Sequence, residues 1–258
     1  MKLDLCSTFL DLGDAVSKNL TMAHGHGCHI SYGEETITES CLLEIHRRHP
    51  KVVNIKTITK RQEAANGADW EWHLVGRKYS LKMRVQAKRL GKGASHFSGL
   101  LTYTAKGAPK PQIKMLIDDA NAHSLFPAIC LYSPNSAKKR WSAKAKIACP
   151  SGFEFGCLIG DATQVKANDH ASLEHITMPW HFLTCPRPVP YTRRPWKNPS
   201  IPNFAALNSE ENLEGRGISR TPDKWTLGRA LGEIGERRQS YIERGIMGVL
   251  QIDGRRLT

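Results

Sequence analysis

Two alternating runs of residues, joined by a three-residue link, constrain this chain more than any other feature. Apolar and polar side chains alternate in residues 68–75, ADWEWHLV, and again in residues 79–90, YSLKMRVQAKRL. A period of two is typical of a β-strand whose two faces meet different surroundings. The link of Gly76, Arg77 and Lys78 leaves room only for a tight turn. The pattern therefore predicts an antiparallel hairpin.

The polar face of this hairpin carries the residues with the clearest chemistry. Asp69 lies near the start of the first strand, and Gln86 and Lys88 lie two residues apart on the second. Residues two apart on a strand share a face, so the hairpin can bring a carboxylate, an amide oxygen and an amine together. Mg²⁺ takes oxygen ligands, and a nearby lysine can orient water and stabilise charge on a phosphoryl group. This set favours metal-dependent hydrolysis of phosphodiesters.

Further helix and strand patterns surround the hairpin. Apolar residues at helical spacing predict a helix over residues 35–49, with Thr36 and Glu39 as a capping box at its start. The patterns also predict a strand over 52–59, a second helix over 111–123 and a buried strand over 126–133. The order of helix, three strands, helix and strand indicates an α/β fold, with a mixed sheet flanked by helices.

These residues resemble a known signature. GADWEW followed by RVQAKR resembles the D-(x)n-(E/Q)xK pattern of the PD-(D/E)xK nuclease superfamily, and the glutamine form resembles its Mrr-like restriction branch. The resemblance implies a restriction-endonuclease-like core with Asp69 and Gln86 as metal ligands and Lys88 as the catalytic lysine. It implies Mg²⁺ or Mn²⁺ as cofactor and a role in defence against foreign DNA. A wider stretch, about 31–185, resembles an uncharacterised bacterial family.

The resemblance also implies a glutamate from the first helix, for which Glu39 is the expected residue and Glu35 the alternative. The chain departs from the signature because no proline precedes Asp69 and a glutamine stands in the place of the second acid. Metal affinity would then depend on Asp69 and on one glutamate. Besides Glu39 and Glu35, Glu63 and Glu71 are candidates for that glutamate. The competing interpretation is that the polar strand face is simply solvated.

The charge balance bears on the partner. Lysine and arginine number 37 against 24 acidic residues, a formal net charge of +13, which favours nucleic acid, with double-stranded DNA expected first. Arg84, Arg89 and Lys92 are the expected contacts, helped by basic loops at 91–110 and 138–146 and by Arg193 and Arg194. Two alternatives stay open: an inactive nucleic-acid-binding protein on the same fold, and a basic module that binds a protein partner. A homodimer also stays open.

The chain divides into three parts by composition. Residues 1–30 are expected to be loop-like, residues 31–185 form the predicted nuclease domain, and 186–258 begin with a proline-rich basic linker and continue as an extension. A helix is expected near 226–243. Seven cysteines without a CxxC pair are expected to be small buried hydrophobes in a reducing cytoplasm. No membrane span is expected.

Two other groups of residues have competing interpretations. The segment HGHGCHI offers four potential metal ligands, and His181 and Cys185 could complete such a site. The ligands do not have the spacing of a zinc finger, so the segment is expected to be a loop. The ligands would be His24, His26, Cys28 and His29. Trp70 and Trp72 share the apolar strand face and are expected to be core residues rather than surfaces on which bases stack.

Overall fold

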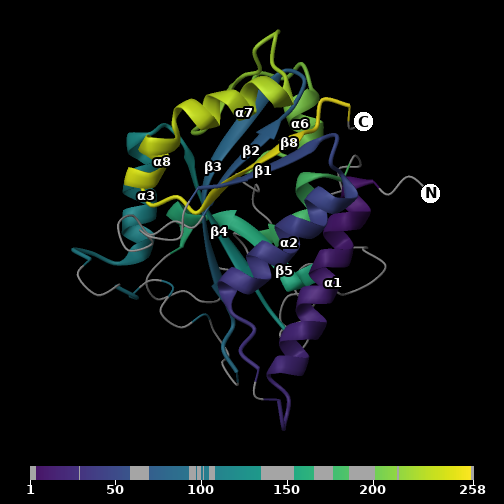
Figure 1. Ribbon diagram of the computed structural model, residues 1–258, viewed down its shortest axis with the longest axis vertical. Coiled ribbons are helices and arrows are strands. Elements are labelled where there is room, and N and C mark those ends of the chain that lie inside the picture. Colours follow the sequence, from purple (N-terminus) through teal and green to yellow (C-terminus); the bar gives the residue numbers. More distant parts are fainter. Residues whose placement is uncertain are drawn as a thin grey trace.

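A single mixed β-sheet forms the centre of the protein, and helices cover both of its faces (Figure 1). The α/β class predicted from the sequence is thereby confirmed. The computed structural model describes residues 4–28, 30–58, 70–92, 97, 100, 102–104, 108–134, 154–165, 177–185, 201–213 and 215–256. Within those ranges, no helix has both the length and the apolar character needed to cross a membrane.

The elements follow one another along the chain as a mixture of helices and short strands. The α-helices are α1 (Leu5–Ala23), α2 (Glu34–Arg48), α3 (Gln112–Ala122), α6 (Phe204–Asn208), α7 (Leu227–Glu236) and α8 (Arg238–Glu243). The strands are β1 (Val53–Thr57), β2 (Trp70–Val75), β3 (Tyr79–Arg89), β4 (Phe126–Tyr132), β5 (Cys157–Asp161), β6 (Thr177–Pro179), β7 (Ile218–Arg220) and β8 (Gly248–Asp253). Single 3₁₀ turns are η2 (Glu154–Gly156), η3 (Ala162–Gln164) and η4 (Trp180–Leu183).

The sheet has the order β1-β8-β2-β3-β4-β5-β6, and β7 pairs with the start of β3. Strands β2 and β3 are antiparallel, with Trp70 opposite Val85, as the alternation predicted. Strand β4 runs parallel to β3. Strand β8, from the predicted C-terminal extension, lies between β1 and β2 and pairs with both. The last part of the chain therefore supplies an interior strand of the sheet.

The two faces of the sheet differ in character. One face packs against α1, α2, η4 and α6 through the largest apolar cluster of the protein, which includes Trp70 and Trp72 as core residues, as expected. The opposite face carries two smaller apolar clusters, one beneath α3 and one beneath α7 and α8. Between these two clusters, β2 and β3 present polar side chains. The candidate functional residues lie in this polar stripe.

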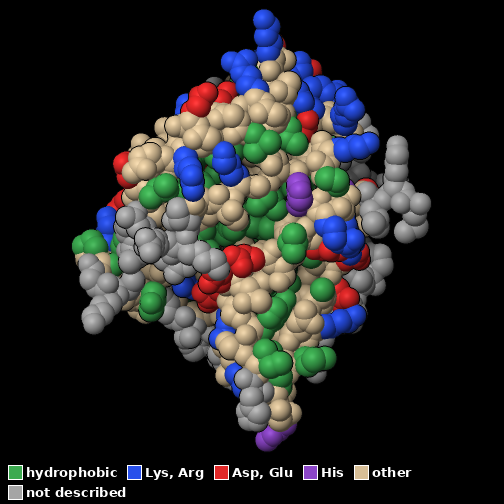
Figure 2. Space-filling model, in the orientation of Figure 1, with side chains coloured by type: hydrophobic (Ala, Val, Ile, Leu, Met, Phe, Trp, Pro, Cys, Tyr) green, Lys and Arg blue, Asp and Glu red, His purple; other side chains and the backbone are tan. Residues whose placement is uncertain are grey.

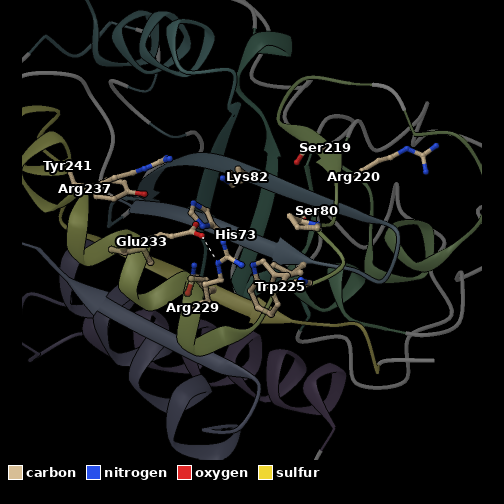
Figure 3. Close-up of a pocket in the computed structure, with 16 residues that line it drawn as sticks. His73, Ser80, Lys82, Ser219, Arg220, Trp225, Arg229, Glu233, Arg237 and Tyr241 are labelled. Carbon is tan, nitrogen blue, oxygen red and sulfur yellow. Dashed lines mark ion pairs between the residues drawn. The ribbon is translucent and has the colours of Figure 1, made fainter.

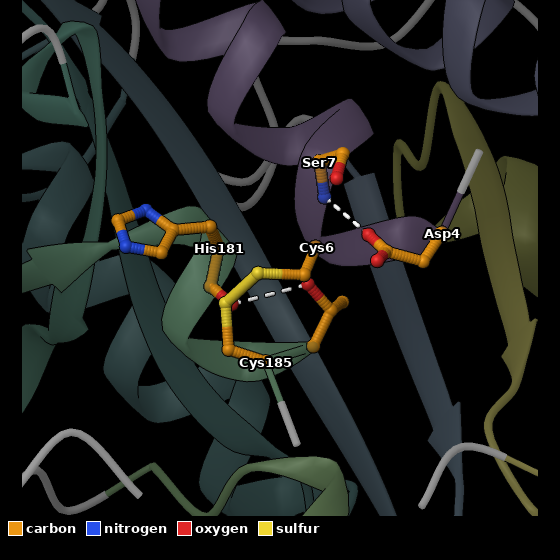
Figure 4. Close-up of a disulfide and its surroundings, with 6 residues drawn as sticks. Asp4, Cys6, Ser7, His181 and Cys185 are labelled. Atoms are coloured by element: carbon orange, nitrogen blue, oxygen red, sulfur yellow. Dashed lines mark hydrogen bonds between the residues drawn. A yellow bond between two sulfur atoms is a disulfide. The ribbon is translucent and has the colours of Figure 1, made fainter. Parts of the chain in front are cut away.

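The prediction that residues 1–30 are loop-like is wrong for α1, a 19-residue helix. Asp4 caps it by accepting a hydrogen bond from the Ser7 backbone N–H at 2.6 Å (Figure 4). Its buried apolar residues lie on one face at helical spacing, a pattern that the sequence displays and that the interpretation as a loop overlooked. They are Leu5, Phe9, Leu12, Val16 and Leu20.

One disulfide joins α1 to the segment after η4. Cys6 and Cys185 are bonded across a separation of 179 residues, with their Cα atoms 4.8 Å apart (Figure 4). This differs from the expectation that the cysteines are unpaired hydrophobes, because the packing of α1 against η4 brings together two residues that no local pattern connects. Free buried cysteines do occur, as expected, at 41, 130 and 157, whereas Cys149 lies outside the described residues.

The position of β8 predicts a steric effect at Gly248. A Cβ atom built there would lie 2.3 Å from a ring carbon of Trp70 on the neighbouring strand. We expect Gly248→Ala to lower the free energy of unfolding by about 1–3 kcal/mol, because the core must shift to admit the methyl group. Gly228→Ala is the matched control, because nothing lies within 4 Å of that Cβ. Urea denaturation measures both, and equal effects would contradict the close packing of β8.

Candidate active site

The carboxyl end of β3 carries two of the predicted catalytic residues. Gln86 and Lys88 lie on the same face of β3, as predicted, opposite Ile129 and Leu131 of the parallel strand β4. The described pairing between β2 and β3 ends at Trp70 and Val85, so β3 continues beyond it. Asp69 and Glu63 lie outside the described residues, as do 138–146, Arg193 and Arg194.

Glu34, the first residue of α2, provides the carboxylate nearest to Lys88. Its Oε2 lies 3.6 Å from Lys88 Nζ, and its Oε1 accepts a hydrogen bond from the Arg89 backbone N–H at 3.1 Å. The Leu90 N–H donates to Tyr132 on β4. Successive N–H groups of a strand point to opposite sides, so the Arg89 N–H points to the flank where β2 runs. Glu34 is therefore fixed at the flank of β3 beside Lys88.

The surroundings of Lys88 hold its ammonium group in one place. The side chain is only 16% exposed, whereas that of Glu34 is 37% exposed. The Nζ atom also lies 5.1 Å from the ring centre of Tyr103, a cation–π contact, and Tyr103 itself is half exposed. Lys88 is thus restrained on two sides at the edge of the protein. An amine in this position can donate to an anion or to water that approaches from solvent.

The structure places Glu34, rather than Glu39 or Glu35, beside the predicted catalytic lysine. Glu39 follows Glu34 by five residues, which is about 140° around the helix and about 7.5 Å along its axis, and both Glu35 and Glu39 are exposed. The capping box of Thr36 and Glu39 is also a wrong prediction, because the N-cap of α2 is Gly33, without a side-chain cap. The sequence pattern predicts a helix that begins at residue 35, one residue after α2 begins, and therefore does not point to Glu34.

Arg84, expected to contact nucleic acid, is instead an interior residue, and that expectation is corrected. Its side chain is 0% exposed. The guanidinium lies 2.6 Å from Asp119 on α3 and 3.4 Å from Glu71 on β2. A charged side chain without contact to solvent needs such partners. Arg84 cannot reach a phosphate at the surface, and it anchors the centre of the polar stripe.

Glu71 is held in the same cluster by hydrogen bonds and ion pairs. Its Oε1 atom lies 2.8 Å from Nε2 of His73. Its Oε2 atom, which also faces Arg84, lies 3.3 Å from the guanidinium of Arg244. Burial by itself raises the pKa of the carboxyl. The hydrogen bond from His73 and the charges of His73, Arg244 and Arg84 outweigh it and lower the pKa of Glu71 to about 2. The carboxylate is therefore charged and fully engaged with cations.

The two other predicted contacts, Arg89 and Lys92, lie at the edge of the site. Arg89 is partly buried and Lys92 is exposed, and Lys92 donates from Nζ to the Gly25 carbonyl at the end of α1. Burial, followed by the charges of Arg89 and Lys92, lowers the pKa of His24 below its usual value. The end of α1 and the end of β3 thus form one basic edge next to Lys88.

The oxygen donors of Glu34 and Gln86 suit a hard cation such as Mg²⁺. Gln86 is 1% exposed, so its amide is buried within the sheet region at this end of β3. Among the described residues, no three His, Cys, Asp or Glu side chains lie close enough together to hold a metal ion. Asp69 is outside those residues and stays the predicted third oxygen donor, in addition to Glu34 and Gln86.

The histidine-rich segment offers no second metal centre within the described residues. His24 is the C-cap residue of α1, and His29 lies outside the description. Cys185 and His181, the residues that could complete this metal site, have other roles in the structure. Cys185 is disulfide-bonded, and burial lowers the pKa of His181 to about 4 within the core.

Comparison with known proteins assigns the chain to a family. A search of curated proteins found no match. A family model described as "Family of unknown function (DUF6615)" matches residues 5–223, which include α1, the β2–β3 hairpin and Glu34. The match covers well over half of the chain, and the chain therefore belongs to the DUF6615 family.

Proposed function

We propose that this protein is a metal-dependent nuclease that hydrolyses phosphodiester bonds, with DNA as the first expected substrate, on a restriction-endonuclease-like core. The observation that carries the proposal is the fixed pair of Lys88 and Glu34 at the carboxyl end of β3. Gln86 lies on the same strand face as Lys88. The resemblance implies a glutamate from the first helix, and Glu34 of α2, rather than the expected Glu39, is the residue that contacts Lys88.

In the proposed reaction, water attacks phosphorus and the bond to the leaving sugar oxygen breaks. Lys88 would donate to a phosphoryl oxygen and so stabilise the negative charge that develops there, while the attacking water loses a proton to solvent and the leaving oxygen takes one up. Glu34 would hold Lys88 in position and offer an oxygen donor together with Gln86 and Asp69. The chemistry that bound Mg²⁺ or Mn²⁺ supplies is polarisation of the phosphoryl oxygen and activation of water.

The surface around the pair suits a nucleic-acid substrate. Arg89 and Lys92 at the edge of the site are placed to meet backbone phosphates, contacts that position a duplex without reading its sequence. Tyr103, half exposed beside Lys88, offers a ring on which an unpaired base can stack. The formal charge of +13 strengthens attraction to any polyanion.

The proposal is tested by cleavage assays on plasmid, linear duplex, single-stranded DNA and RNA. Each runs with Mg²⁺, with Mn²⁺ and with chelator, and compares the wild type with Asp69→Ala. We expect cleavage that needs metal and that Asp69→Ala reduces by about 10²-fold or more, because the substitution removes a carboxylate ligand. Cleavage that survives chelation would contradict the proposal.

Binding without cleavage would instead support an inactive nucleic-acid-binding protein on the same fold. In that case the affinity for nucleic acid should fall steeply as the salt concentration rises and should not depend on a divalent metal ion. Failure to bind any nucleic acid at low salt would favour a basic module that recognises an acidic protein.

A homodimer and a cytoplasmic location also remain predictions, and the Cys6–Cys185 disulfide argues against a reducing compartment.

A further inference from the structure

A cavity of about 230 Å³ lies at the opposite end of β3 from the candidate active site. Figure 3 shows it between the β2–β3 hairpin and the helices α7 and α8. Its walls combine His73 and Lys82 from the hairpin with side chains from residues 219–241. Concave sites of this kind suit small ligands.

The cavity is lined by far more positive than negative charge. Lys82, Lys224, Arg229 and Arg237 line it together with one carboxylate, Glu233, which lies 3.6 Å from Arg229. Within the described part of the chain, no carboxylate forms an ion pair with Lys82, Lys224 or Arg237. Figure 2 shows that Lys and Arg side chains gather at the end of the molecule where α6 and α7 lie. These cations suit an anionic ligand.

Arg220 lines the same cavity but does not take part. Figure 3 shows its side chain directed away from the other labelled residues, and its guanidinium lies 5.6 Å from the ring centre of Tyr79. Arg237 differs, because its side chain points back toward Lys82 and His73 (Figure 3). Lys82 and Arg237 therefore form the pair of cations best placed to meet one ligand.

The other residues around Lys82 and Arg237 are held in place by their own contacts. His73, only 7% exposed, forms part of the lining and is fixed by its hydrogen bond to Glu71. The negative charge of Glu71 is already matched by Arg84 and Arg244, so it does not cancel the cations of the cavity. A second cavity of about 600 Å³ shares four lining residues with the first. They are Lys82, Ser219, Arg237 and Tyr241.

We propose that this cavity binds a small phosphate-bearing anion, up to the size of a mononucleotide, through Lys82 and Arg237. Charge-assisted hydrogen bonds from lysine and arginine are the usual means of holding phosphate oxygens. The site is separate from the candidate active site. Lys82 and Lys88 are six residues apart on one strand, about 20 Å at the rise of an extended chain. The proposal therefore does not depend on nuclease activity.

The test is calorimetric titration of the full-length protein with inorganic phosphate and with AMP, at fixed ionic strength and with chelator present. We expect binding of one or both that weakens by about tenfold or more in Lys82→Gln/Arg237→Gln, because two charge-assisted contacts are lost. Arg238→Gln is the matched control, because Arg238 is exposed and adjacent to Arg237 but does not line the cavity. It should bind as the wild type does.

Three results would overturn the proposal. The first is that the wild type binds neither phosphate nor AMP at millimolar concentration. The second is that the double variant and Arg238→Gln bind equally well, which would show that only general positive charge matters. The third is that Lys88→Ala abolishes binding while Lys82→Gln/Arg237→Gln does not, which would place the anion in the candidate active site. Thermal unfolding of each variant confirms that the fold is intact.

Discussion

Replacing Glu71 by glutamine is expected to lower the free energy of unfolding by about 3–5 kcal/mol, the usual cost of breaking a buried ion pair from one side. The substitution keeps the shape of the side chain and removes its charge. Within the described part of the chain, Arg84, 0% exposed, would then keep Asp119 as its one close anion. His73 and Arg244 would each lose a carboxylate partner. Denaturation in urea, followed by circular dichroism, measures the loss.

Glu44→Gln is the control that separates burial from charge pairing. The pKa of Glu44 is also lowered to about 2, mainly by the hydrogen bond from Arg47. Its side chain, however, is 26% exposed on the surface of α2, compared with 4% for Glu71. Solvent screens such pairs, so Glu44→Gln should cost about 1 kcal/mol or less. Equal losses in the two variants would contradict the importance of the buried cluster.

The effect of Glu71→Gln on the free energy of unfolding should depend on pH in a defined direction. The pKa of Glu71 falls from an ordinary value of 4.5 to about 2 in the folded protein. The stability it contributes is therefore fully present above pH 4.5 and is lost as pH falls from 4.5 toward 2. The difference in stability between the wild type and Glu71→Gln should narrow over that interval. A difference that stays constant down to pH 2 would contradict the lowered pKa.

Lys88→Ala is expected to reduce the rate of DNA cleavage by about 10²–10⁴-fold, the range over which a positioned proton donor or acceptor contributes to catalysis. Stability should change little, because the partner of Lys88 is a carboxylate 37% exposed, and ion pairs of that kind contribute about 1 kcal/mol or less. Lys114→Ala, an exposed lysine on α3, is the control and should cleave at the wild-type rate. Equal rates in the two variants would remove Lys88 from the mechanism.

The sequence predicts the parts of the site that depend on local pattern. Alternation along β2 and β3 places Gln86 and Lys88 on one face, and helical spacing identifies α2 and α3, because both periods are visible within about ten residues. The same pattern cannot say what covers a polar face. The sequence pattern favours a surface position for Arg84, whereas Asp119 and Arg244 cover it from distant parts of the chain.

The remaining features depend on packing between distant segments. Glu34 gains its role because the first turn of α2 packs beside the end of β3, and no spacing rule links residue 34 to residue 88. Strand β8 enters the sheet between β1 and β2 from the far end of the chain. Cys6 and Cys185 are joined only through the packing of α1 against η4. Long-range contacts of this kind leave no periodic trace in the sequence.

The most direct test of the proposed active site is the cleavage rate of Glu34→Gln measured beside that of Glu39→Gln. Both substitutions remove one carboxylate from α2, and Glu34 is the one that lies beside Lys88 and accepts from the Arg89 backbone N–H. The site described above predicts a rate about 10–100-fold lower for Glu34→Gln, typical of losing a group that orients a catalytic centre, and a wild-type rate for Glu39→Gln. Loss of cleavage in Glu39→Gln with full activity in Glu34→Gln would contradict it.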